Sequence, residues 1–357
     1  MSVRENVRHL IDTLEISQLL SLNEFEYIID NADNSDVTYL GEKAEKVKKE
    51  NYGKKIYIRG LVEISNHCKN NCFYCGIRCA NKNITRYRLS KEEILERCKV
   101  GYELGFRTFV MQGGEDVGFS DEYLADIVME IKKLYHDCAV TLSVGERERD
   151  IYQMFFDAGA DRYLLRHETA DDEHYGKLHP HSMSLEYRKK CLFNLKEIGF
   201  QTGCGFMVGS PYQKSIHLAK DMMFLKKLNP EMVGIGPFIT HKDTPFKEKK
   251  SGSLEKTLLM VGLTRLLLPK ALIPATTALG TIKEGGREMG IKMGANVIMP
   301  NLSPNNTKKL YNLYDNKLAT GLETAENLED LKQQIAKTGH EIVTDRGDYN
   351  RGGIENV

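Results

Sequence analysis

From Lys55 onward, short apolar segments alternate with longer charged segments that have helical spacing, and this alternation limits the folds open to the chain. Short apolar runs predict eight strands, over residues 56–65, 108–112, 140–144, 163–166, 203–208, 232–238, 273–277 and 297–299. Helical spacing predicts helices between them, over residues 91–104, 122–135, 151–158, 185–198, 216–228 and 254–268. Strands that alternate with helices pair in parallel, because parallel neighbours need long crossover connections.

The length of this pattern predicts a closed α/β barrel. The pattern runs from residue 55 to residue 301, close to the roughly 250 residues typical of a (β/α)8 TIM barrel. An open, doubly wound parallel sheet is the alternative. Helical spacing predicts an N-terminal helical cap over residues 1–50. The barrel domain is then expected over residues 51–315, with a helical C-terminal tail over residues 316–357 that packs on or beside it.

The composition is that of a large folded protein. The 357 residues are 41% hydrophobic, which is enough to bury a sizeable core. Fifty basic and fifty acidic side chains cancel, so we expect neither a nucleic-acid nor a membrane partner. The N-terminus lacks a signal-peptide core and no run reaches about 18 apolar residues, which predicts a cytoplasmic protein. The eight cysteines are therefore expected to be reduced thiols and metal ligands rather than disulfides.

Three of these cysteines, Cys68, Cys72 and Cys75, are spaced as C-x3-C-x2-C just after the first predicted strand. A ferredoxin-type 4Fe-4S cubane is held by four thiolates, so three would leave one iron open to another ligand. A zinc knuckle is the alternative, but a closed zinc site uses four ligands, and no fourth cysteine lies nearby at zinc-pair spacing. Cys79 is interpreted as a bystander, because a fourth thiolate would close the open iron.

Polar residues collect where the predicted strands end. Residues 112–116 end the second predicted strand, Glu146 follows the third, and residues 166–169 end the fourth. The active site of a TIM barrel forms at the carboxyl ends of its strands. These side chains are therefore expected to surround one site. His167 and His241 also lie at this rim, and the pattern assigns neither of them a role.

The cysteine spacing, with Tyr74 before the last cysteine, resembles that of the radical S-adenosylmethionine (SAM) superfamily. Four longer runs resemble the HydE family of FeFe-hydrogenase maturases, over residues 162–169, 234–239, 273–278 and 294–300. The similarity extends over nearly the whole predicted barrel. It implies an enzyme that uses one 4Fe-4S cluster to cleave SAM reductively to a 5′-deoxyadenosyl radical, for assembly of the hydrogenase active-site cluster (the H-cluster).

The resemblance also implies roles for individual positions, with Cys68, Cys72 and Cys75 as the cluster ligands. The positions implied to bind SAM are Gly113, Gly114, Glu115, Glu168, Arg188 and Met207. The positions implied to line the substrate cavity are Arg162, Arg166, Thr276, Thr277, Met299 and Tyr311. Of these, Arg166 and the threonine pair would hold the carboxylate of a small or organometallic substrate derived from cysteine. Arginine suits a carboxylate because its planar fork donates two parallel hydrogen bonds.

Several alternatives stay open. Arg166 and Glu168 could form only a rim ion pair, which would be nearly neutral in energy, and the two threonines could be ordinary strand residues. An amino-acid mutase like methylornithine synthase is a second candidate function. An iron-sulfur carrier or scaffold is a third, from another class.

The C-terminal region differs from that of several HydE proteins, which bind a second cluster there through cysteines. This chain has no cysteine after Cys204, so the sequence predicts a single cluster. The resemblance further implies an external electron donor, and it leaves room for other hydrogenase maturases as partners.

Overall fold

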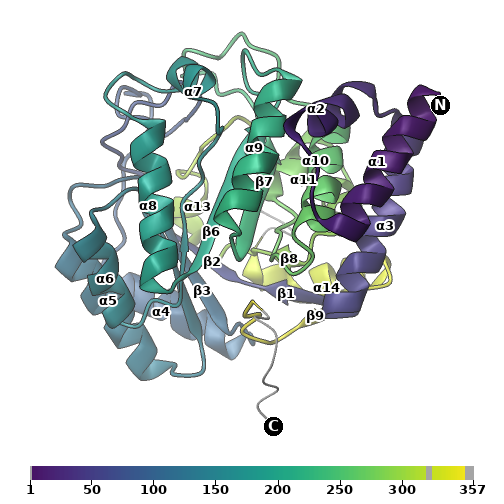
Figure 1. Cartoon of the computed structure of the whole chain (residues 1–357). Helices are drawn as coiled ribbons and strands as arrows, with labels where there is room; N and C mark the ends of the chain where they lie inside the picture. Colours follow the sequence, from purple (N-terminus) through teal and green to yellow (C-terminus); the bar gives the residue numbers. More distant parts are fainter. Residues whose placement is uncertain (1, 319–323, 350–357) are drawn as a thin grey trace.

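The computed structural model describes residues 2–318 and 324–349. The chain begins with three helices, α1 (Val3–Ser17), α2 (Leu22–Asn31) and α3 (Asn34–Tyr52), as the apolar spacing predicts. Each begins at a capping box, in which the serine or aspartate before the helix accepts a hydrogen bond from the backbone three residues later. The apolar faces of the three helices join the main core, so together they cover one side of the barrel (Figure 1).

Six strands form a parallel sheet in chain order, β2-β3-β4-β5-β6-β7. They are β2 (Gly60–Ser65), β3 (Thr108–Gly113), β4 (Ala139–Ser143), β5 (Arg162–Leu164), β6 (Gln201–Val208) and β7 (Met232–Pro237). Most of their residues are buried, because helices cover the outer face and side chains fill the interior. The predicted strands from β3 to β7 are confirmed to within two residues.

The ring is closed by the first and last strands. The first predicted strand is divided at Arg59 into β1 (Lys55–Ile58) and β2. β1 pairs in parallel with β8 (Val297–Ile298), and a single parallel bridge joins Leu61 of β2 to Asn301. The chain thus adopts the predicted α/β barrel rather than an open sheet.

One predicted strand, over residues 273–277, is wrong. Only isolated bridges at Leu272 and Pro274 link β7 to β8 there, and Thr277 already begins α11 (Thr277–Ile282). Pro274 has no N–H to donate to a strand ladder, which limits regular pairing at this point. The threonine pair therefore lies at a helix start and not in a strand.

Helices cover the outside of the barrel (Figure 1). The predicted helices are confirmed as α4 (Lys91–Glu103), α5 (Asp121–Leu134), α6 (Arg149–Asp157), α8 (Leu185–Ile198), α9 (Ser215–Leu228) and α10 (Leu254–Leu267). Three further helices that the pattern does not predict are α7 (Asp172–Leu178), α12 (Gly286–Lys292) and α13 (Asn305–Lys308). α3 of the cap packs on α10, which explains why α10 is buried on nearly all sides. Over the described part of the chain, no helix combines the length and apolar character needed to span a membrane.

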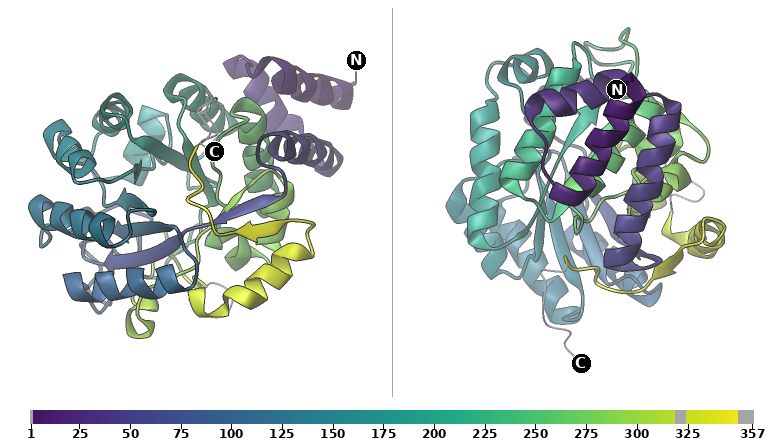
Figure 2. Two further views of the ribbon diagram at one scale, coloured as in Figure 1. Left: turned by 90° about the horizontal axis from the view of Figure 1, so that it is seen from below. Right: turned by 45° about the vertical axis from the view of Figure 1, so that its right-hand side comes forward.

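The C-terminal segment is not the purely helical tail that the sequence predicts. A 3-10 turn, η2 (Ala325–Asn327), leads into α14 (Leu328–Ala336), and then β9 (Glu341–Val343) pairs in parallel with β1. Figure 2 (left) shows the following segment crossing beneath the barrel, at the amino ends of its strands. A three-residue strand is too short to leave a periodic signal. The predicted tail beyond residue 349 lies outside the described residues.

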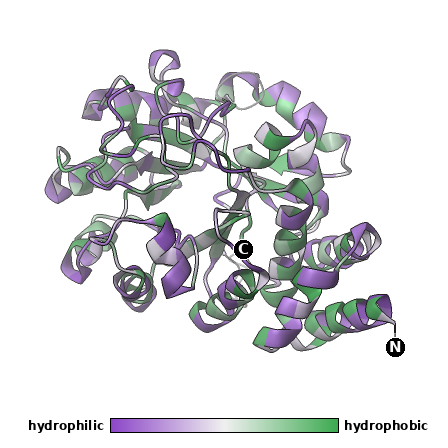
Figure 3. Ribbon diagram, turned by 90° about the horizontal axis from the view of Figure 1, so that it is seen from above, coloured by the Kyte–Doolittle hydropathy of each residue, from purple (hydrophilic) through white to green (hydrophobic). Residues whose placement is uncertain are grey.

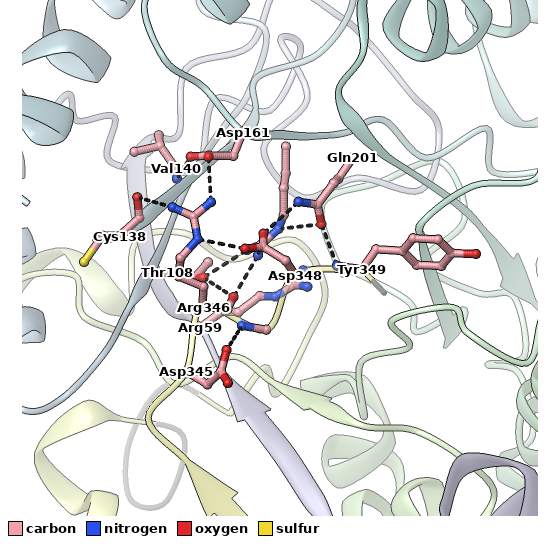
Figure 4. Close-up of polar contacts among 12 residues, drawn as sticks. Arg59, Thr108, Cys138, Val140, Asp161, Gln201, Asp345, Arg346, Asp348 and Tyr349 are labelled. Carbon is pink, nitrogen blue, oxygen red and sulfur yellow. Dashed lines mark hydrogen bonds and ion pairs between the residues drawn. The ribbon is translucent and has the colours of Figure 1, made fainter. Parts of the chain in front are cut away.

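This crossing segment builds a polar network at the amino end of the barrel (Figure 4). Every guanidinium nitrogen of buried Arg162 has a partner: Nη1 donates to Thr108 Oγ1 (2.9 Å), Nη2 to the Arg346 carbonyl and to Asp348 (both 2.7 Å), and Nε to Gln201 (3.3 Å). Arg346 in turn pairs with Asp161 (2.8 Å) and Asp348 (2.8 Å). The placement of Arg162 in the substrate cavity is therefore wrong. Its side chain is tied to the C-terminal segment.

Candidate active site

A cavity of about 350 Å³ opens inside the barrel at the carboxyl ends of the strands, which is a usual size for a small-molecule site. Figure 3 looks down on the long connecting segments that cover this end. The predicted site residues that line the cavity are Cys68, Cys72, Cys75, Gly113, Gly114, Glu115, Arg166, Glu168, Arg188, Met207, Thr276, Thr277, Met299 and Tyr311. Arg162 is the one predicted site residue that does not line it.

The three cysteines lie on the loop after β2. The loop is tied to the rim of the barrel, since Lys69 N donates to the Glu115 carbonyl (2.9 Å) and Gly76 N to the Leu313 carbonyl (2.8 Å). Arg86 braces it from within, by donating to the carbonyls of Ile77 (2.8 Å) and Arg78 (2.7 Å) among others. This bracing holds the cysteine side chains toward the cavity.

The cysteine loop suits a cluster better than a single metal ion. Among the described residues, no three histidine, cysteine or acidic side chains lie close enough to share one ion. A cubane does not require such convergence, because each thiolate binds a different iron. Burial raises the pKa of the Cys75 thiol to about 12, so metal binding there would have to displace its proton. Cys79 is exposed and does not line the cavity.

The Gly113-Gly114-Glu115 segment packs directly on the cysteine loop. A Cβ at Gly114 would lie 2.2 Å from the His67 carbonyl oxygen, so only glycine fits there. The Glu115 carboxylate accepts a hydrogen bond from the Glu146 backbone (3.1 Å) and lies 3.4 Å from Lys69 Nζ. Glu115 is therefore a buried anion beside the cysteines, and its Oε2 makes no hydrogen bond to the described residues.

Arg166 and Glu168 face the cavity from the end of β5. Arg166 Nη2 lies 3.2 Å from Glu168 Oε2, while Arg166 Nε makes no hydrogen bond to the described residues. Glu168 adopts φ of 66°, a left-handed conformation that is rare outside glycine and common at functional sites. Nearby, Arg188 donates to Glu146 (2.5 Å) and to the Arg166 carbonyl (3.1 Å). Burial raises the pKa of Glu146, although the charge of Arg188 opposes this effect.

His167 stabilises this strained turn through its two ring nitrogens. Its Nδ1 accepts from the Gly205 backbone (3.4 Å), which leaves Nε2–H to donate to Asp221 (3.2 Å). The same Asp221 oxygen accepts from the Ala170 backbone (2.6 Å), and both side chains are fully buried. Burial lowers the pKa of His167 well below its usual value, so the ring is neutral. This pair fixes the backbone on which Arg166 and Glu168 stand, a role that the sequence did not reveal.

The rest of the cavity lining combines hydroxyl groups with apolar surface. Thr276 precedes α11 and its hydroxyl lies 3.5 Å from the Ile235 carbonyl, so it is nearly free to bind a ligand. Gln112 Nε2 donates to the Tyr311 hydroxyl (3.3 Å), and burial raises the pKa of Tyr311 well above its usual value. Met207 and Met299 supply apolar walls.

The strand-end residues that the sequence expects at the site include Gln112, which lies next to the last residue of β3 and lines the cavity. The sequence did not reveal the hydrogen-bond partner of Tyr74. Half-buried Tyr74 donates to His179 Nε2 (3.0 Å), whose Nδ1 donates to the Tyr175 carbonyl (3.0 Å). Nothing in the local sequence connects Tyr74 to a histidine so far along the chain. His241 packs on Gly76 outside the cavity, so it supports the cysteine loop.

Comparison with known proteins finds several related sequences. A model of the radical SAM superfamily matches residues 62–225. The [FeFe] hydrogenase maturase subunit HydE of Thermotoga maritima is 50% identical over 275 residues, which cover 77% of this chain and 78% of that protein. The 3-methylornithine synthase of Methanosarcina acetivorans is 30% identical over 71% of this chain and 72% of that enzyme.

Solved structures show the same fold. Methylornithine synthase (PylB) superposes with a TM-score of 0.82 at 24% identity, covering 94% of this chain and 97% of that one. The FeFe-hydrogenase maturase HydG superposes with a TM-score of 0.80 at 19% identity, covering 95% and 76%. The fold and the long, close sequence match together place the chain: it belongs to the HydE family of radical SAM enzymes.

Proposed function

We propose that this protein cleaves SAM reductively in the course of FeFe-hydrogenase active-site assembly, as a maturase of the HydE type. The observation that carries the proposal is the convergence of three unpaired cysteines, the Glu115 carboxylate and the Arg166–Glu168 pair on one cavity. The 50% identity to a HydE maturase adds the reaction class. A 4Fe-4S cluster on Cys68, Cys72 and Cys75 would supply the electron that splits SAM into methionine and a 5′-deoxyadenosyl radical.

The residues beside the cysteines would orient SAM. Glu115 is a buried carboxylate next to the cysteine loop and would accept hydrogen bonds from the SAM amino group, and Gly113 and Gly114 let backbone come close. Glu168 and Arg188, which line the same cavity, would bind other polar groups of SAM. Met207 would contact the adenosine.

The second ligand would bind beside SAM. Arg166, Thr276 and Thr277 line the same cavity, together with Met299 and Tyr311. Free donors on Arg166 and a loosely bound Thr276 hydroxyl suit an anionic group such as a carboxylate. We assign them to the carboxylate of a cysteine-derived iron complex. A buried cavity with apolar walls would also shield a radical from water.

The cellular setting is part of the proposal. Eight cysteines without a disulfide among the described residues suit a reducing compartment, and we propose the cytoplasm. The protein would need an external electron donor and would hand its product to other maturases.

We also propose a single cluster per chain, because no cysteine follows Cys204.

The test is anaerobic reconstitution with iron and sulfide, reduction by dithionite, and incubation with SAM. We expect about four irons per chain and formation of 5′-deoxyadenosine. A reproducible value near eight irons, with two cubanes by spectroscopy, would refute the single-cluster proposal. Cluster binding without any SAM cleavage would make the protein a carrier or scaffold instead.

A second candidate is an amino-acid mutase, because methylornithine synthase shares the fold over nearly the whole chain and a relative of it is 30% identical. Lysine distinguishes the two functions. Rearrangement of lysine by the reduced, SAM-loaded protein would favour the mutase, while SAM cleavage with lysine left unchanged favours the maturase.

A further inference from the structure

Tyr212 lies at the carboxyl end of the barrel, and both its exposure and its backbone conformation are unusual for an aromatic residue. Its side chain is 52% exposed, and its backbone has φ of 67°, in the left-handed region that favours glycine. Two lysines lie over the ring, with Lys249 Nζ at 4.9 Å and Lys177 Nζ at 5.9 Å from the centroid. A large exposed aromatic ring on a strained backbone is a feature expected of a contact surface rather than of a fold requirement.

This ring is continuous with the cysteine loop. Tyr212 packs edge-on against Phe246 at 6.3 Å between centroids, and Phe246 packs against Phe73 at 6.1 Å. Phe73 directly follows Cys72 in the sequence. The Cys72 sulfur lies 3.8 Å from the sulfur of Met183, which is partly exposed. The cysteine loop is therefore linked to exposed Tyr212 through Phe246 and Phe73, and partly exposed Met183 lies against Cys72.

The same face is positively charged, although the chain as a whole has a formal charge of zero. The segment from residue 242 to residue 250, which carries Phe246, contains exposed Lys242, Lys247, Lys249 and Lys250 against Asp243 and Glu248. Across the ring, the ion pair that Lys177 makes among the described residues is with highly exposed Glu173, a contact of little energy. An acidic protein would find complementary charge here.

We propose that Tyr212, Lys177, Lys249 and Met183, here called the Tyr212 face, dock an acidic, low-potential electron-carrier protein that reduces the cluster. This inference rests on the proposed function, because it names the kind of protein that would supply the electron for SAM cleavage. One electron passes from the reduced carrier to the oxidised cluster, and no bond is made or broken in this step. A carrier bound there would lie beside side chains that contact Cys72 or follow it in the sequence, namely Met183 and Phe73.

The test compares charge reversal on the Tyr212 face with charge reversal elsewhere. The test variant is Lys177→Glu with Lys249→Glu, and the control is Lys46→Glu with Lys133→Glu, two exposed lysines on the helices α3 and α5. Tyr212→Gly is a third variant, which removes the ring while suiting the left-handed backbone. The probe is a bacterial 4Fe-4S ferredoxin, whose dissociation constant from the reconstituted protein is measured in its oxidised state at low salt.

We expect the test variant to weaken ferredoxin binding by about tenfold or more, with no change in the control. Tyr212→Gly should weaken it too. Cleavage of SAM driven by reduced ferredoxin should fall in parallel, while cleavage driven by dithionite should not, because dithionite needs no docking surface. Equal ferredoxin affinity in the test and control variants, or no binding by the unmodified protein, would overturn this docking surface. If the unmodified protein did not cleave SAM when reduced by dithionite, that result would instead overturn the proposed function.

Discussion

Charged residues are used in opposite ways at the two ends of the barrel. At the amino end, every guanidinium nitrogen of Arg162 is bonded to a neighbouring side chain or carbonyl. At the carboxyl end, Arg166 faces a cavity, and its Nε makes no hydrogen bond to the described residues. The two arginines are four residues apart in the sequence: Arg162 begins the short strand β5, and Arg166 follows its end.

The difference separates residues that hold the fold together from residues that can bind a ligand. A buried donor without a partner is costly, so natural proteins keep one mainly where a ligand satisfies it. Arg59, beside the amino-end network, shows that the division is incomplete: its Nη1 lies 2.9 Å from the Met232 sulfur, and its other two nitrogens make no hydrogen bond to the described residues. The following substitutions test whether the amino end stabilises the fold while the carboxyl end binds ligands, and they are given in order of decreasing expected effect.

Cys72→Ala, at the carboxyl end, should abolish both the cubane and SAM cleavage, because a site that begins with three thiolates would keep only two. Iron analysis, the visible spectrum and a 5′-deoxyadenosine assay measure the effect. Cys79→Ala is the matched control and should retain both properties, since Cys79 is exposed and outside the cavity. Loss of the cubane in the control would contradict the three-ligand site.

Asp348→Ala, at the amino end, should lower the free energy of unfolding by about 3 kcal/mol, because it leaves the fully buried Arg162 without its counter-ion. Urea unfolding measures the change, and Glu341→Ala in the exposed part of β9 is the control. Burial raises the pKa of Asp348, but the charges and hydrogen bonds of Arg162 and Arg346 outweigh this effect and lower it. The stability from this carboxylate is thus lost as the pH falls through that lowered pKa. A drop in SAM cleavage by the folded variant would show that the two ends are not independent.

Arg166→Lys should weaken binding of the anionic substrate by about ten- to a hundredfold, because lysine cannot reproduce the two parallel hydrogen bonds of the guanidinium. SAM affinity should change little. Isothermal titration with each ligand separates the two effects. Equal losses for both ligands would place Arg166 in the SAM site.

Asp221→Ala should raise the dissociation constant of SAM by about tenfold, because His167 would lose the partner that fixes the turn under Glu168. Asp221→Asn keeps an oxygen that accepts from His167 and from the Ala170 backbone, so it should retain most of the affinity. If alanine and asparagine had the same effect with unchanged stability, the turn would not depend on this hydrogen bond.

Lys48 tests the region where the cap meets the C-terminal segment, and we expect the smallest effect there. Its Nζ donates to the Ile291 carbonyl (2.9 Å) and to His340 Nε2 (2.7 Å), and burial lowers its pKa to about 7 although Glu45 opposes this. The unfolded chain binds this proton more tightly, so the free energy of unfolding should rise by about 1 to 2 kcal/mol between pH 7 and pH 9. Lys48→Met should flatten this part of the pH profile, as measured by urea unfolding. An unchanged profile would contradict a lowered pKa.

Much of this architecture could be predicted from short stretches of sequence. The alternation of apolar runs with helical spacing predicts the parallel barrel, because each strand or helix is encoded by a few neighbouring residues. Since parallel strands in a barrel all point one way, the residues that follow their ends gather at one rim, and Glu115 and Glu168 lie there. The spacing of the cysteines likewise reflects a local loop.

Only the tertiary structure decides which of two similar side chains meets a ligand. Arg162 and Arg166 look alike in the sequence, but Asp348, 186 positions after Arg162, completes the hydrogen bonds of Arg162. Arg166 meets a carboxylate only two residues away, Glu168, and its Nε makes no hydrogen bond to the described residues. The support of Glu168 by His167 depends in the same way on a distant residue, Asp221 of α9. Such partners are set by how distant elements pack, and no local pattern records that packing. The sequence by itself determined the barrel and its rim, and long-range contacts decided which polar groups remain free.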